Sequence, residues 1–113
     1  MSRKVCVLLL FLFFGGCYNV YADERIIVEN IMGRDICEFY ISAHAERDWG
    51  DDLFESLDRC IHHGEYADVI WSDSWRNTSY DLRVVFRDGS DWVLENQYPQ
   101  TGPGGTRFTF DAR

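Results

Sequence analysis

The stretch "YDLRVVFRDGSDWVLEN", from Tyr80 to Asn96, decides the fold class of this chain. Two runs rich in aliphatic and aromatic residues flank Asp88-Gly89-Ser90, a composition that is typical of a β-hairpin turn. A three-residue loop at 88–90 places Phe86 opposite Trp92, and such matched cross-strand pairs stabilise a sheet. A two-residue loop would instead place Phe86 opposite Asp91, and a slip by one residue turns every side chain to the other face. The sequence therefore predicts an antiparallel hairpin with an odd-length loop.

Further short strand-like runs, separated by turn residues, occur at residues 25–30, 36–42, 65–71 and 107–112. Between them, Leu53, Leu57 and Cys60 recur at helical spacing, which predicts one or two helical turns. Pro99 and Pro103 both fall in the glycine-rich segment 97–107, which predicts an irregular connection. We therefore expect an all-β domain, an antiparallel sandwich or small barrel. A small antiparallel β-sandwich of about six to seven strands with one short helical turn is the preferred form.

The first 22 residues have the layout of a secretory signal peptide. Arg3 and Lys4 supply positive charge, residues 5–14 are apolar, and Ala22 offers a cleavage position. The apolar run is about half of the roughly 20 residues that a spanning helix needs, so we expect no stable transmembrane anchor. We expect cleavage near Ala22, one domain at residues 23–113, and a periplasmic or secreted location. The alternative is a lipoprotein that carries its lipid on Cys17 of "FGGC".

The mature domain is strongly acidic. After cleavage 91 residues remain, and they hold all 19 acidic residues against nine arginines and no lysine, a net charge of −10. Such a surface repels nucleic-acid phosphates and anionic lipid, and it attracts cations and basic proteins. We therefore expect a protein or envelope partner that is basic, and no nucleic-acid binding.

Cys37 and Cys60 are the two cysteines of the mature domain, and in an exported protein they most simply form one disulfide. Closing a loop of about two dozen residues stabilises the fold by about 3 kcal/mol. A metal site built on the two cysteines is the competing interpretation. At period 2, Cys37 shares one strand face with Phe39 and Ile41.

The stretch "RDWGDDLFESLDRC", residues 47–60, gathers acidic residues around a Trp-Gly pair. Calcium binds six to eight oxygens, many from loop carboxylates. Calcium is therefore a candidate cofactor, although the spacing matches no EF-hand. The structural alternative is that Asp51 or Asp52 caps the helical turn, with Glu55 completing a capping box. The candidate metal ligands are Glu46, Asp48, Asp51 and Asp52.

Four other residues form a candidate binding surface: Trp49, Trp75, His62 and His63. Aromatic rings beside small polar residues can bind sugars or peptides, and we expect Trp75 to be exposed and Trp71 to be buried. Trp49 alternatively plugs the end of the sandwich. The paired histidines lack the spacing of known zinc motifs, and a solvent-facing turn is the preferred interpretation.

A resemblance is carried by Asn30 and Gly33 and by three segments: "FYIS" at 39–42, "WGDDL" at 49–53 and "DLR" at 81–83 followed by Asp88-Gly89. Together they resemble a group of small exported bacterial proteins of unestablished function. Members of this group are sometimes labelled argininosuccinate lyase, although the chain is far too short for that helical-bundle enzyme. The resemblance implies a β-sandwich and export, and it implies no active site.

For catalysis, Ser42 and His44 lie close in sequence, but no GxSxG elbow or triad order accompanies them. We therefore expect a non-enzyme rather than a small hydrolase. The leading hypothesis is an exported binding or interaction module of the cell envelope, with calcium as a candidate aid. The alternative is an acidic periplasmic inhibitor or immunity-type protein that binds a basic partner protein.

Overall fold

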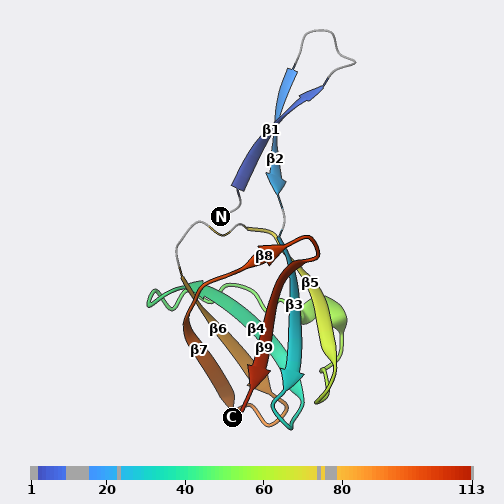
Figure 1. Ribbon diagram of the computed structural model, residues 1–113, viewed down its shortest axis with the longest axis vertical. Coiled ribbons are helices and arrows are strands. Elements are labelled where there is room, and N and C mark those ends of the chain that lie inside the picture. The colour runs from blue at the N-terminus through green and yellow to red at the C-terminus, as the bar shows by residue number, and fades with distance from the viewer. Residues whose placement is uncertain (1–2, 10–15, 23, 74, 76–78, 113) are drawn as a thin grey trace.

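The computed structural model describes residues 3–9, 16–22, 24–73, 75 and 79–112, and two β-sheets form its body (Figure 1). One sheet has three strands, in the order β4 (Ile36–Ala43), β6 (Tyr80–Phe86) and β7 (Asp91–Gln97). The other has four strands, in the order β5 (Tyr66–Trp71), β3 (Glu24–Ile31), β9 (Gly105–Asp111) and β8 (Thr101–Gly102). The 3-10 turn η2 (Glu55–Leu57) lies in the connection between β4 and β5. The expected small β-sandwich with one short helical turn is confirmed.

Two remaining strands, β1 (Arg3–Leu9) and β2 (Gly16–Ala22), pair with each other as a separate ribbon that projects from the sandwich in Figure 1. They cover the segment expected to be a signal peptide, and cleavage near Ala22 stays a prediction. Within the described part of the chain, no helix has the length and apolar character needed to cross a membrane.

The core lies between the two sheets, and contacts between phenylalanine rings form part of it. Phe39 on β4 is fully buried, with its ring centroid 5.6 Å from that of Phe54 and 5.9 Å from that of Phe110 on β9. Burying each such ring contributes about 1.5–3 kcal/mol. Because Phe39 contacts both the opposite sheet and the segment before η2, it joins the acidic loop to the core.

One strand pairing differs from the expected antiparallel arrangement. β3 and β9 run parallel, with Val28 opposite Phe108, whereas the other pairings of the two sheets are antiparallel. The short strand β8, in the segment expected to be irregular, turns the chain back so that β9 lies beside β3. Val28 and Phe108 are both buried, so the parallel register keeps both apolar faces in the core.

The β6–β7 hairpin has the expected three-residue loop, but the loop lies one residue earlier than expected. The backbone N–H of Phe86 donates to Ser90 O at 2.8 Å, and Gly89 adopts φ +90° inside the loop. Trp92 therefore lies opposite Val84 rather than opposite Phe86. The predicted pairs were wrong, because each paired residue of β7 lies opposite a β6 residue two positions earlier in the chain than predicted. This shift keeps residues 82–85 and 91–94 on their predicted faces, because the side-chain period is two, and the register shifts again between Leu82 and Tyr80.

The predicted disulfide between Cys37 and Cys60 is present, with their Cα atoms 4.1 Å apart. The pairing of β4 with β6 shifts between Ile36 and Glu38, so Cys37 sits at a bulge. Ile36 is consequently fully buried, and Cys37 is only half-buried. The expectation that Cys37 shares the core face was wrong because the bulge interrupts the period of two. A structural disulfide points to an oxidising compartment.

Candidate functional site

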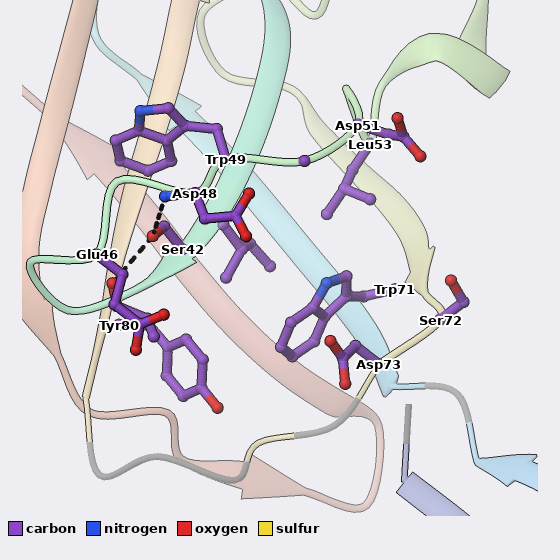
Figure 2. Close-up of a pocket in the computed structure, with 13 residues that line it drawn as sticks. Ser42, Glu46, Asp48, Trp49, Asp51, Leu53, Trp71, Ser72, Asp73 and Tyr80 are labelled. Atoms are coloured by element: carbon purple, nitrogen blue, oxygen red, sulfur yellow. Dashed lines mark hydrogen bonds between the residues drawn. The ribbon is translucent and has the colours of Figure 1, made fainter. Parts of the chain in front are cut away.

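A groove of about 490 Å³ opens at the end of the sandwich where β4 and β5 finish and β6 begins (Figure 2). Its wall combines aromatic rings with carboxylates, and no basic side chain lines it in the described part of the chain. Three aromatic residues contribute, namely Trp49, Trp71 and Tyr80. Four acidic residues contribute, namely Glu46, Asp48, Asp51 and Asp73. The groove therefore offers apolar ring surface and negative charge together.

The acidic side chains of the groove differ in direction. Figure 2 shows the carboxylates of Glu46, Asp48 and Asp73 turned toward the middle of the groove, and that of Asp51 at its edge beyond Leu53. The backbone N–H of Asp48 donates to Ser42 Oγ at 3.0 Å. This bond holds Asp48 over the groove from the end of β4.

Asp52 does not line the groove, because its side chain accepts hydrogen bonds from the backbone. Its Oδ1 accepts hydrogen bonds from the N–H groups of Phe39 and Phe54, each at 2.9 Å. It thereby ties the loop to β4 and holds the chain that enters η2. The expected capping box is not formed, since no side chain caps η2.

The four candidate calcium ligands are therefore not brought together. Glu46 and Asp48 face the groove, Asp51 lies at its edge, and Asp52 points to the backbone of β4. Among the described residues, no group of three or more histidine, cysteine or acidic side chains is arranged to hold a metal ion. Calcium binding stays a prediction.

The loop that carries the groove acids is held by a buried carboxylate, Asp81 on β6. Its oxygens lie 2.7 Å from His44 Nδ1 and accept N–H groups of Ala45 at 3.0 Å and Asn96 at 2.9 Å. Burial alone raises the pKa of Asp81, but the bonds from His44 and the two backbone groups outweigh it and lower that pKa. Ala45 adopts a left-handed φ of 68°. Asp81 therefore fixes an unusual backbone at the start of the loop.

Neither tryptophan has its expected exposure, because Trp71 and Trp75 are both half-buried. Trp71, expected to be buried, is half-buried and lines the groove together with Trp49. Trp75, expected to be exposed, packs at 4.4 Å from Trp71 between ring centroids and donates its Nε1–H to Thr106 Oγ1 at 3.1 Å. Tyr80 lies 4.8 Å from Trp75 and completes the cluster. Trp75 therefore supports the groove from behind.

His62 and His63 lie at the opposite end of the strands, beside the start of β4. His62 Nδ1 lies 2.8 Å from Asp35 Oδ1, and this bond raises the pKa of His62. His63 Nδ1 accepts the N–H of Gly33 at 2.9 Å. The two histidines thus link the turn after β3 to the segment before β5, and they take no part in the groove.

Comparisons with protein-family models, curated proteins and solved structures find no match for the chain. The resemblance to small exported bacterial proteins stays a prediction. Sequence reasoning singled out Trp49, Glu46, Asp48 and Asp51, but it did not join them to Trp71. The signal that could have joined them is that 43–53 and 71–80 leave strands at the same end of the sandwich.

Proposed function

We propose that this chain is an exported binding module whose acidic, aromatic groove holds a basic partner protein. The observation that carries the proposal is the lining of the groove, where four carboxylates and three aromatic rings meet without a described basic side chain. A basic side chain placed there would gain both ion pairing and contact with a ring.

The charge of the whole domain supports the same partner. A net charge of −10 on 91 residues attracts basic proteins over long range and speeds their encounter. Orientation then depends on the groove, where the rings and carboxylates are close together. Overall charge thus accounts for attraction, and the groove accounts for the site of binding.

Hydrogen bonding near the groove favours binding over hydrolysis. The Ser42 hydroxyl donates to Ala43 O at 2.9 Å and accepts from Asp48 N. His44 directs its Nδ1 to Asp81. Ser42 and His44, which are close in sequence, therefore each have a structural partner, and the proposal invokes no catalysis.

The test is binding of a fluorescent peptide rich in arginine and lysine, measured by anisotropy at low and high salt. The groove variant Asp48→Asn/Asp51→Asn should bind about tenfold more weakly than the wild type. The matched control Glu55→Gln/Asp58→Asn removes the same charge from exposed residues outside the groove and should change affinity by less than about twofold. Equal weakening in both variants would show that only net charge matters and would contradict the proposal.

Calcium is the competing occupant of the same acids. If it binds there, millimolar calcium should raise the melting temperature, and the Asp48→Asn/Asp51→Asn variant should lose that rise. The inhibitor or immunity-type alternative uses the same groove against a basic enzyme or toxin. It predicts stoichiometric loss of that partner's activity, which a passive binding module would leave unchanged.

A further inference from the structure

Resting on the proposed function and deepening it, we propose that the groove receives one arginine side chain of the partner. The guanidinium would stack on the indole of Trp71 and pair with the carboxylate of Asp48. Arginine recognition of this kind needs a free carboxylate, an accessible ring and a fixed geometry.

The first requirement is a carboxylate without a partner. Most acidic side chains of this domain that form ion pairs do so with arginine, as Asp68 does with Arg25 and Asp91 with Arg83. In the described part of the chain, by contrast, the side chains of Glu46 and Asp48 form no ion pair or hydrogen bond. An arginine from outside would supply the partner that these acids lack.

The second requirement is an accessible ring beside that carboxylate. Trp71 is half-buried and lines the groove, and Figure 2 shows its indole between the carboxylates of Asp48 and Asp73. Trp49 is also half-buried on the groove wall. A cation over an indole gains about 0.5–2 kcal/mol, and tryptophan is the best ring for this contact.

The same combination of ring and carboxylate already holds arginines inside this molecule. The guanidinium of Arg34 lies 4.0 Å from the ring centroid of Phe86 and donates to Asp88 at 2.8 Å. Arg83 likewise lies 5.3 Å from the Tyr40 ring and pairs with Asp91. In the groove, Trp71 and Asp48 offer this arrangement without a described arginine, whereas the Trp49 ring already has the guanidinium of Arg47 at 5.9 Å from its centroid.

The third requirement is a preorganised geometry. Asp48 is held through its backbone by Ser42, and Trp71 is packed against Trp75 at 4.4 Å and against Tyr80 at 5.8 Å. Fixed groups lose little freedom on binding, so more of the interaction free energy appears as affinity.

Arginine fits these groups better than lysine or calcium. A guanidinium is planar and weakly hydrated, so it can stack on the indole while its N–H groups pair with a carboxylate. A lysine ammonium is compact and strongly hydrated, and it gains less from the ring. Calcium requires six to eight oxygens, and no metal-holding group of three side chains exists among the described residues.

The experiment uses three capped tripeptides, Gly-Arg-Gly, Gly-Lys-Gly and Gly-citrulline-Gly, titrated into the protein by calorimetry. Citrulline has the shape of arginine and no charge. We expect the arginine peptide to bind about tenfold more tightly than the citrulline peptide and several-fold more tightly than the lysine peptide. Asp48→Asn should remove the preference over citrulline, and the exposed control Glu55→Gln should keep it.

Trp71→Phe keeps a ring at the site and should weaken arginine binding several-fold with little change for lysine, which separates stacking from charge. Equal binding of arginine and citrulline, or an unchanged preference in Asp48→Asn, would overturn the inference. If arginine is not preferred but the long basic peptide still binds at the groove acids, the inference fails and the proposed function stands. If neither ligand binds at the groove, both fail.

Discussion

Replacing Asp81 with asparagine tests how the loop beneath the groove is held in place. Asp81 is fully buried, and its two oxygens interact with His44, Ala45 and Asn96 at 2.7–3.0 Å. Asparagine has nearly the same shape but only one acceptor oxygen, and its amide group would face a donor. The change therefore removes hydrogen bonds without creating a cavity.

The expected loss follows from these contacts. A hydrogen bond to a charged group contributes about 1.5–3 kcal/mol, and a buried donor left without an acceptor costs about 1–3 kcal/mol. Asparagine keeps part of the network through its remaining oxygen. We therefore expect Asp81→Asn to lower the free energy of unfolding by about 2–4 kcal/mol. The loop that positions Asp48 should loosen with it.

The measurement is urea unfolding at pH 7, followed by circular dichroism. Asp91→Asn is the control, because Asp91 is an exposed acid on β7 paired with Arg83 at 2.9 Å, and such pairs contribute about 0–1 kcal/mol. The lowered pKa of Asp81 adds a pH signature. Its stabilisation is present above the unfolded pKa of about 3.9 and is lost as the pH falls through the folded value. A loss no larger than that of the control would refute this account of the loop.

Three further predictions concern the rest of the fold. Gly105→Ala should lower the free energy of unfolding in urea by about 2 kcal/mol or more, because Gly105 has φ +110° and the new Cβ would lie 2.5 Å from a carbonyl oxygen of β3. The control Gly104→Ala places a Cβ that meets nothing within 4 Å. Equal losses in the two variants would contradict this close approach. Replacing Cys37 and Cys60 with serine should lower the free energy of unfolding by about 3 kcal/mol, and a loss below about 1 kcal/mol would contradict the loop-closure argument. His62 should titrate by NMR above 6.5, because its carboxylate partner Asp35 raises its pKa. Its contribution to stability is therefore present at lower pH and is lost as the pH rises through the pKa of the folded state. A midpoint at or below 6.5 would disprove the pairing.

The sequence predicts the fold well where local chemistry decides it. The turn residues around Gly89 and the alternation in β6 predict the hairpin, its odd-length loop and the faces of its strands. They do not determine the register, because a shift by two residues keeps each side chain on the same face of the sheet. The register depends on where in the loop Gly89 takes its left-handed conformation. The parallel pairing of β3 with β9 joins the two ends of the domain, and no local pattern specifies it.

Less of the candidate site than of the fold could be predicted from the sequence. Asp81, His44 and Asn96 are far apart in the chain, and their network depends on tertiary packing. Composition alone cannot show that Trp71 lines the groove whereas Trp75, which is also half-buried, does not. The Trp75 indole instead donates to Thr106 on β9. The sequence shows that acidic residues gather around position 50, but it does not predict that the Asp52 side chain accepts a hydrogen bond from the backbone of β4.

The most direct test of the central claim observes the tryptophan side chains themselves. The arginine tripeptide is added to ¹⁵N-labelled protein, and the four indole N–H signals are assigned with single Trp→Phe variants. Trp49 and Trp71 should shift with saturation, whereas Trp92, which lies on β7 outside the groove, should remain in place. The citrulline tripeptide at the same concentration should give much smaller shifts, because it is expected to bind about tenfold more weakly. Equal shifts with citrulline, or a shift of Trp92 without Trp71, would contradict an arginine site in the groove.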